Sequence, residues 1–297
     1  MSEFLDGLLQ KLLEEMYQGL WTWTSKMYDL MQGTLSSGIT KSRNLVGQSP
    51  QSWNKVAYDF VKGVAEDAAI PIAACILTFV FCWQIISMVQ EGNQMHNIKP
   101  ETMVILMIKL GICILVCSKS FEIVNGLFDI ADWGINHIPY SFSAEEGTVS
   151  LEDIAPREVE RYDFGMVIEM LGNGLFTLIA ILITYVLSIA IYIRVNIWYL
   201  ELLIYASAAP IPLSTFMNKE WGQVGTNYLR KMLAMSFEGF FMIVAFSLYG
   251  ALVGHATQLT ASYSYLMAMV TNIGCGVALV ILLSKTGNIS ASIFNAH

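Results

Sequence analysis

Few residues of this chain have the types and spacing that enzymatic or metal chemistry requires. The four histidines are scattered, without the H-E-x-x-H spacing of a metal site, and there is no P-loop, nucleophile elbow or glycine fingerprint. The five cysteines all fall in apolar runs. Cys113 and Cys117 share one helix face, but two thiols alone make a poor metal site and fit small buried hydrophobes better. We therefore expect no enzyme, and no bound metal or cofactor.

The residues that stand out are charges inside or beside long apolar runs, namely Lys109, Arg194, Glu201 and Glu238. A charge at the centre of a bilayer costs about 2.5–3.5 kcal/mol on insertion scales, so such a side chain should face other helices or water. Arg194 and Glu201 lie two turns apart on one helix face, and each could pair with Glu238 or Lys231 of a neighbouring helix. The alternative is that these charges serve packing alone.

Composition places these charges in a membrane protein. Apolar residues make up 55% of the 297 residues and charged residues 13%, and the mean hydropathy is +0.54. A soluble domain carries about 25% charged residues. The predicted fold class is an all-α polytopic membrane protein with five to six membrane segments. The start, M-S-E-F-L-D, is acidic, so we expect no cleaved signal peptide and a first span that acts as the targeting signal.

Five apolar runs are long enough, at about 1.5 Å per residue, to approach or exceed the roughly 30 Å hydrocarbon core of a bilayer. They are Ala68–Val89, Thr102–Ser118, Gly172–Ile193, Met232–Val253 and Tyr263–Ser284. In the last two runs and directly after the first of them, small residues that let helices approach closely are predicted packing positions: Gly250, Gly254, Gly274 and Gly276.

A proline-broken stretch, I-Y-A-S-A-A-P-I-P-L-S-T-F, follows the third run at Ile204–Phe216. Pro210 and Pro212 each remove a backbone donor, so the helix must break or kink there, and we predict a hinge at these two residues. In lipid an unpaired carbonyl costs several kcal/mol. The break should therefore be surrounded by protein or a water-filled cavity.

The chain is predicted to fall into four parts: an amphipathic N-terminal helical region (1–67), two spans (68–118), an acidic loop with a helix extension (119–165) and a C-terminal bundle (166–297). Apolar residues recur at helical spacing over Phe4–Met31 and Trp53–Ala65, and Gly33–Pro50 is predicted to be a linker. The first 31 residues contain five acidic and two basic side chains, which favours packing of this segment against another helix or subunit over binding to anionic lipid.

The number of crossings stays open between five and six. A cytoplasmic loop Asn218–Lys231 satisfies the positive-inside rule and also puts the C-terminus in the cytoplasm. If Ile197–Met217 crosses, there are six spans, the N-terminus is inside, and most basic loop residues are cytoplasmic. If it turns back, there are five spans and the N-terminus is outside. Charge bias favours six, but a proline-broken stretch is the one most suited to re-enter.

Four segments follow one another in the second half of the chain: a long span, then R-V-N-I-W-Y-L-E-L-L-I-Y-A-S-A-A-P-I-P-L-S-T-F, then a basic loop with N-Y-L-R-K, and then a span containing E-G-F-F. This order resembles the TrbL-like membrane subunits of type IV secretion systems, especially those of Gram-positive conjugative elements. The resemblance is best over Met166–Gly254. It implies a multi-pass subunit of the bacterial cytoplasmic membrane that works beside ATPases and a bitopic scaffold protein. It also implies a ring of identical subunits that helps relaxase-bound single-stranded DNA to cross.

The acidic net charge of −8 bears on that role. It is the wrong sign for holding DNA alone, so contact with the strand should be transient, along uncharged polar groups that let it slide. One alternative is a secondary transporter that uses the break near Pro210 to expose helix ends to an ion or solute, although the sequence lacks the internal repeat of many transporters. Another is a membrane scaffold without a conduit.

Overall fold

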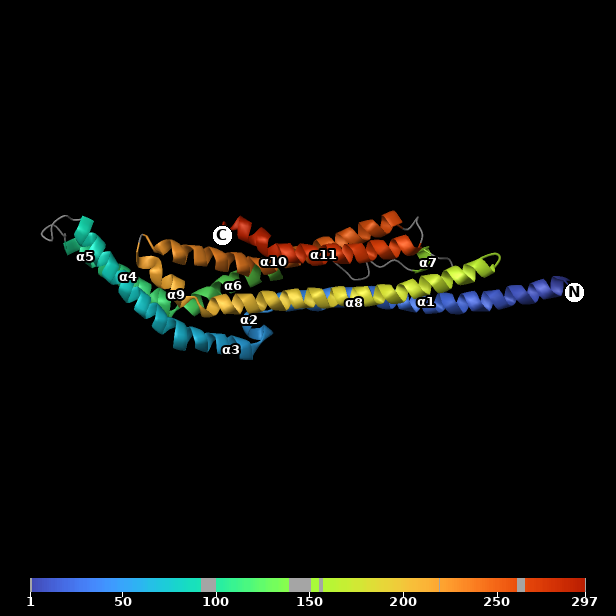
Figure 1. The fold of residues 1–297 in the computed structure, drawn as a ribbon, viewed down its shortest axis with the longest axis horizontal. Coiled ribbons are helices and arrows are strands. Elements are labelled where there is room, and N and C mark those ends of the chain that lie inside the picture. Colours follow the sequence, from blue (N-terminus) through green and yellow to red (C-terminus); the bar gives the residue numbers. More distant parts are fainter. Residues whose placement is uncertain are drawn as a thin grey trace. The chain divides into compact units, whose positions relative to one another are not determined.

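The computed structural model describes residues 2–91, 100–138, 151–154, 157–218, 220–260 and 265–296, and these contain helices, turns and short extended stretches but no strand (Figure 1). The long helices are α1 (Ser2–Val46), α4 (Ile70–Glu91), α5 (Pro100–Ser118), α6 (Ser120–Asn136), α8 (Phe164–Ser207), α10 (Gly222–Thr260) and α11 (Tyr265–Ile293). The short ones are α2 (Pro50–Trp53), α3 (Lys55–Val64), α7 (Leu151–Ile154) and α9 (Pro210–Leu213). The chain is an all-α polytopic membrane protein.

Five helices among the described residues are long and apolar enough to cross a membrane: Lys55–Gln90, Glu101–Ser118, Phe164–Ser207, Gly222–Ala256 and Tyr265–Ile293. The stretch Ile197–Met217, which would supply a sixth crossing, forms no separate spanning helix. Its first part continues α8 to Ser207, and only α9 and a 3-10 turn, Ser214–Met217, follow. The helices therefore agree with five crossings rather than the six that charge bias favours.

The chain divides into two compact units. Unit 1 comprises residues 1–44, 139–195 and 242–284, and unit 2 comprises residues 45–138, 196–241 and 285–297. The divisions 67/68, 118/119 and 165/166 suggested by the sequence therefore do not coincide with them. Both units are built from segments that are distant in sequence, because long helices return beside one another.

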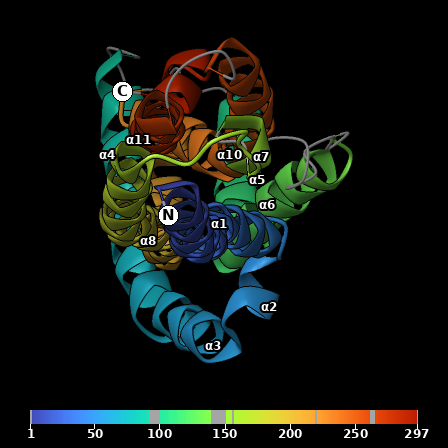
Figure 2. The ribbon, with the colours of Figure 1, turned by 90° about the vertical axis from the view of Figure 1, so that its right-hand side faces the viewer.

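In unit 1, α1 runs beside α8 in the same direction (Figures 1 and 2). A Cβ on Gly174 would lie 2.1 Å from the Trp23 ring, and one on Gly38 would lie 1.8 Å from Ser188 Oγ. The predicted linker at Gly33–Pro50 is therefore wrong over most of its length. The helix continues to Val46 because no proline interrupts it and because Gly38 lets α8 pack closely against it.

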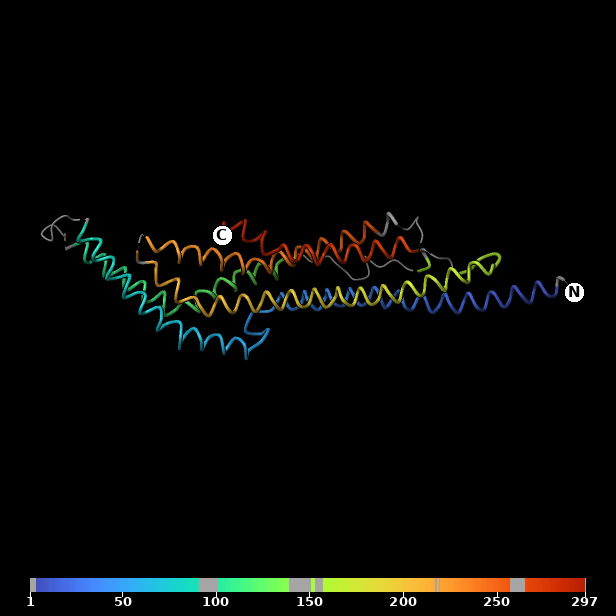
Figure 3. The backbone as a smooth tube through the Cα atoms, in the orientation of Figure 1, coloured from blue at the N-terminus to red at the C-terminus, as the bar shows by residue number. Residues whose placement is uncertain are grey.

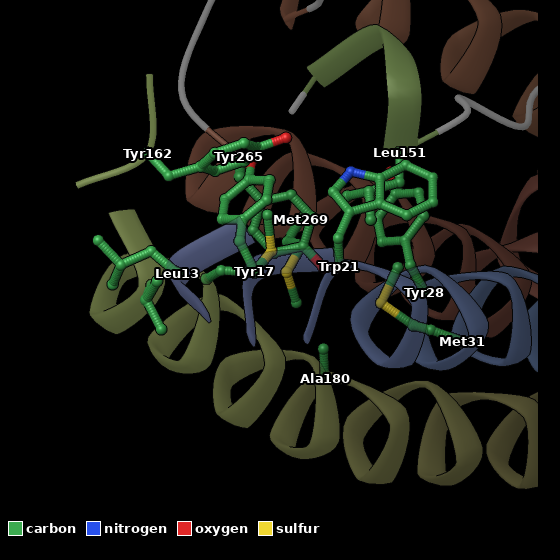
Figure 4. Packing of buried hydrophobic residues seen from close by; sticks show 12 residues of the cluster. Leu13, Tyr17, Trp21, Tyr28, Met31, Leu151, Tyr162, Ala180, Tyr265 and Met269 are labelled. Carbon is green, nitrogen blue, oxygen red and sulfur yellow. The ribbon is translucent and has the colours of Figure 1, made fainter. Parts of the chain in front are cut away.

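The aromatic side chains of α1 form the main apolar cluster of unit 1 (Figure 4). Tyr17, Trp21 and Tyr28 are buried there with Tyr265 and Met269 of α11. Tyr28 and Tyr265 lie 5.7 Å apart between ring centroids, a spacing at which aromatic pairs attract. Part of the apolar periodicity of the N-terminal segment thus serves packing within the chain, whereas Leu5, Leu8 and Leu12 are exposed.

An extended stretch before α8 is tied to α1 by side-chain amides. Gln10 donates to the Tyr162 carbonyl at 3.0 Å and accepts from the Tyr162 backbone N–H at 3.1 Å. Gln18 donates to the Arg157 carbonyl at 2.8 Å, and the Arg157 guanidinium lies 5.3 Å from the centroid of the Trp21 ring. The end of the acidic segment is therefore docked on α1, whereas residues 139–150 lie outside the described residues.

In unit 2, the end of α1 turns at α2 onto the last part of α8. The Tyr199 hydroxyl donates to the carbonyls of Leu45 at 2.8 Å and Gln48, which completes the C-terminal end of α1. The Trp53 ring stacks on Tyr199 at 4.9 Å, and its N–H donates to Asn196 Oδ1 at 3.3 Å. One tyrosine thus holds the turn in place.

The first span begins earlier than the apolar run suggests. α3, a π-helical turn at Ala65–Ala69 and α4 form one continuous helix, so Pro71 lies within it rather than at its start. A π turn is a known way to accommodate a proline inside a helix. α4 pairs with α5, and both contact α9 and the 3-10 turn. The second span ends at Ser118, and α6 starts anew at Ser120.

The α1–α8 contact makes a testable prediction. Gly38→Ala should destabilise the protein by about 1–3 kcal/mol, because the new methyl group overlaps Ser188 in a packed interface. Thermal unfolding in detergent or nanodiscs measures the effect. Gly19→Ala is the matched control, since a Cβ there meets nothing within 4 Å and alanine favours helix. Adding Ser188→Gly should restore part of the loss. Equal unfolding temperatures for the two single variants would contradict this packing.

Candidate functional site

Several backbone carbonyls at the proline break in unit 2 accept hydrogen bonds from the protein itself. Pro210 and Pro212 cannot donate to the carbonyls of Ala206 and Ala208. These two carbonyls instead accept hydrogen bonds of the 3-10 type from Ala209 N at 3.3 Å and Ile211 N at 3.1 Å. The Tyr205 carbonyl accepts from Ala208 N at 3.2 Å and from the Tyr228 hydroxyl of α10 at 2.7 Å. The helix does break where the prolines predict, and protein groups satisfy these carbonyls.

Other elements close the same turn. The Cys113 thiol of α5 donates weakly to the Leu213 and Ser214 carbonyls at 3.6 and 3.7 Å. The Thr215 hydroxyl donates to the Pro212 carbonyl at 2.8 Å and accepts from Gly225 N at 3.2 Å. These hydrogen bonds tie α5 and the start of α10 to the break. Figure 3 traces the backbone of this break between α8 and α10. These contacts brace the corner between α8 and α10, and the hinge at Pro210 and Pro212 stays a prediction.

Glu238 of α10 is a buried carboxylate, with 3% of its surface exposed. Its Oε1 accepts a hydrogen bond from the Thr286 hydroxyl of α11 at 3.3 Å. A Cβ on Gly287 would lie 3.1 Å from both carboxylate oxygens, so glycine there leaves room for the acid. A buried carboxylate needs such partners because its desolvation is costly.

The helices around Glu238 are joined by polar contacts to backbone carbonyls. The Trp198 indole N–H donates to the Met235 carbonyl at 2.8 Å, and Ser290 Oγ donates to the Ala234 carbonyl at 2.6 Å. A Cβ on Gly239 would lie 2.7 Å from the Trp198 ring, so this glycine lets the indole lie against α10. Glu238 therefore sits in a packed junction of α8, α10 and α11.

The other predicted charges have different surroundings. Lys109 is exposed on α5, one turn before the buried Cys113. Glu201 is exposed on α8, and Arg194 is half-buried earlier on the same helix. Lys109, Glu201 and Glu238 belong to unit 2, whereas Arg194 belongs to unit 1. The contacts of Glu238 described above are made to α11, not to Lys109 or Glu201.

The glycines predicted to pack helices differ from one another. A Cβ on Gly276 would lie 3.0 Å from Leu187 and 3.2 Å from Leu35, so three helices of unit 1 meet there. A Cβ on Gly274 would meet nothing within 4 Å, so close approach does not require glycine at that position within this chain. Gly250 and Gly254 are half-buried on α10.

A second polar group lies beside the turn that Tyr199 holds. Asp132 of α6 lines a small cavity of about 20 Å³ with Tyr199, Trp198 and Ser236. Burial raises the pKa of the Asp132 carboxyl, and a hydrogen bond of 3.2 Å from Asn136 opposes the shift. This side chain can take up a proton more readily than an exposed aspartate.

Sequence reasoning missed several of these residues. The last span was predicted to end at Ser284 with a short polar tail, but α11 continues to Ile293. Thr286 and Ser290 recur four residues apart, as one buried helix face requires, and that spacing was an available signal. Nothing in the sequence pointed to the contacts of Tyr199 or Cys113, because they link segments about 100 residues or more apart.

The raised pKa of Asp132 predicts a pH-dependent stability. A carboxyl with a raised pKa in the folded state favours unfolding while it is ionised, and this penalty disappears as the pH falls through its folded-state pKa towards the ordinary value of about 3.9. Asp132→Asn should therefore raise the unfolding temperature at pH 7 to 8 and make little difference near pH 4. Thermal unfolding of both proteins across this range tests it. The exposed control is Asp59→Asn. A pH-independent difference would contradict the assignment.

Comparison with known proteins identifies the family. The family model described as TrbL/VirB6 plasmid conjugal transfer like protein matches residues 35–210. This range starts far upstream of the predicted best resemblance at Met166–Gly254 and ends at the proline break. A search of curated proteins and a search of solved structures find no match.

The match covers more than half of the 297 residues. It takes in α2 to α8, with three of the five helices able to span a membrane, and ends at the first residue of α9. The chain therefore belongs to the TrbL/VirB6 family of plasmid conjugal transfer-like proteins, as a membrane component of a conjugal transfer system.

Proposed function

We propose that this protein forms a ring of identical subunits in the bacterial cytoplasmic membrane, and that the ring helps relaxase-bound single-stranded DNA to cross. The observation that carries the proposal is the family match over residues 35–210 of a chain with five helices able to span the membrane. ATPases and a bitopic scaffold protein of the transfer machine are the expected partners. Contact with the DNA strand is transient.

The number of spanning helices favours a path that is shared between subunits. Single bundles of five helices leave little room for a nucleic acid strand, so the path has to be shared between subunits. The intramembrane charges Lys109, Arg194, Glu201 and Glu238 are proposed to line or brace this path.

A secondary transporter is the weaker candidate. In such proteins a broken helix offers free backbone ends to an ion or solute. Here the Tyr205, Ala206 and Ala208 carbonyls at the break already accept hydrogen bonds from backbone N–H groups, and the Tyr205 carbonyl also accepts one from Tyr228. Flux of a small solute through proteoliposomes that contain the protein would favour the transporter.

Transfer assays test the conduit. Glu238→Ala should lower conjugation frequency by about tenfold or more. The substitution weakens the α10–α11 junction, and a loss of about 1.4 kcal/mol in the free energy of assembly shifts the assembly equilibrium tenfold. Pro210→Ala should also lower it, through the corner that follows α8. Membrane insertion, followed by immunoblot of washed membranes, should remain normal. Glu122→Gln, an exposed carboxylate outside the spans, is the matched control. Normal transfer by both variants would sink the proposal.

Topology gives an independent test. With five spans and a cytoplasmic C-terminus, the N-terminus and the acidic segment 119–163 lie outside the cytoplasm. A reporter enzyme that works only in the cytoplasm should be active when it is fused after residue 297. A reporter enzyme that works only outside the cytoplasm should be active when it is inserted at Glu145. The opposite pattern would overturn this orientation, and matching patterns at both sites would point to six spans.

A further inference from the structure

The helix that carries the first span is longer than a membrane crossing requires. α3, the π-helical turn and α4 run without interruption over Lys55–Gln90, 36 residues that reach about 54 Å at 1.5 Å each. The hydrocarbon core is roughly 30 Å thick. Residues 68–90 carry no charge and are enough to fill this core, whereas residues 55–67 contain several charged side chains. α3 therefore lies beyond the hydrocarbon core, at the end where the span begins.

α3 packs against α6 on this side of the membrane. The second span returns the chain to the side of α3, and α6 starts there. The Asn125 side chain of α6 donates to the Tyr58 hydroxyl of α3 at 2.9 Å. Lys119, directly before α6, pairs with Glu122 at 2.7 Å, and its pKa is raised by this hydrogen bond and also by the nearby Glu66 carboxylate. Charged groups from both segments thus lie close together, just outside the hydrocarbon core.

α3 also has an exposed apolar edge. Val56 and Phe60 are 81% and 71% exposed, and the exposed Val64 follows four residues later. We call these three residues the apolar edge of α3. The charged side chains share another face, since they recur at spacings of three and four residues: Lys55, Asp59, Lys62 and Glu66. A helix with one apolar and one charged exposed face is typical of the membrane interface.

The π-helical turn brings the apolar edge into line with the lipid-facing side of α4. That side contains Ile72, Phe79 and Ile86, which are exposed and recur every seven residues. Val64 and Ile72 are eight residues apart, about 80° beyond two full turns of a regular α-helix. The π turn takes up one extra residue, which leaves these two side chains within about 20° of each other. Figure 1 also shows that the helix changes direction between α3 and α4. The exposed apolar surface therefore continues from α4 onto α3.

We propose that the apolar edge of α3 inserts among the lipids at the membrane surface, as a continuation of the lipid-facing side of α4. The charged face of α3 then lies among headgroups and water, and α6 covers the remaining side. The two positive and two negative charges of that face cancel, so apolar contact, and not attraction to anionic lipid, holds α3 in place. This contact fixes the depth of the first span, and it does not depend on the proposed DNA conduit.

Thiol labelling tests which side of α3 is covered. Val56→Cys and Phe60→Cys on the apolar edge are compared with their neighbours on the charged face, Lys55→Cys and Asp59→Cys, in membranes that contain the assembled machine. A membrane-impermeant thiol reagent is supplied to both sides, and labelling is measured as the increment over the unsubstituted chain with its native cysteines. Because the thiolate reacts, apolar surroundings that raise a thiol pKa by one unit slow labelling about tenfold, and at least this difference is expected between the two faces.

Purified protein separates lipid from a protein partner as the cover. The same four variants are reconstituted at a high lipid-to-protein ratio in phosphatidylcholine vesicles, where other subunits are absent and copies of the chain seldom meet. Slow labelling of the apolar edge that persists there supports contact with lipid. Loss of the difference in either preparation would overturn the inference. In the vesicles it would mean that a partner protein covers the edge in the machine, and in the machine membranes it would mean that water reaches both faces equally.

Discussion

A polar group at bilayer depth has to find its partner inside the protein or in enclosed water, because hydrocarbon offers none. This constraint explains most of what is unusual in the chain. The broken backbone after α8 is closed by Tyr228, Cys113 and Thr215, which come from α10, α5 and the turn itself. Glu238 is met by Thr286 and by the space that Gly287 leaves. Each solution uses a residue from a distant segment, so the polar groups determine which helices must pack together.

The same constraint separates two kinds of glycine. Gly38, Gly174 and Gly276 stand where a Cβ would collide with a neighbouring helix, so they allow backbones or large rings to approach closely. Gly19 and Gly33 of α1 have open space where a Cβ would be. A glycine in the middle of a helix is destabilising by about 0.5–1 kcal/mol relative to alanine. Close packing offsets that cost at Gly38, Gly174 and Gly276, whereas nothing in the structure explains the glycine at Gly19 or Gly33.

The apolar runs allowed the fold class and all five spans to be predicted, because span length and hydropathy are local properties. The break at Pro210 and Pro212 was predictable for the same reason. The helix through Gly33–Val46 was not, since Gly, Ser and Thr suggest a loop in isolation and become helical here against α8. The continuation of α11 past Ser284 was missed because Lys285 and Thr286 end the apolar run while the helical face continues. Tertiary contacts decided both cases.

The fixed corner after α8 bears on how such a protein could pass a strand. Alternating access requires a segment with two arrangements that differ by only a few kcal/mol. At this corner the replacement bonds from Ala209 and Ile211, the Tyr228 hydroxyl and the Cys113 thiol would all have to break before α8 and α10 could swing apart. Each buried hydrogen bond contributes about 1 kcal/mol, and each buried carbonyl left without a partner adds a further cost. A second arrangement of this corner is therefore costly. A wall of fixed helices shared by several subunits, as proposed above, would avoid that cost.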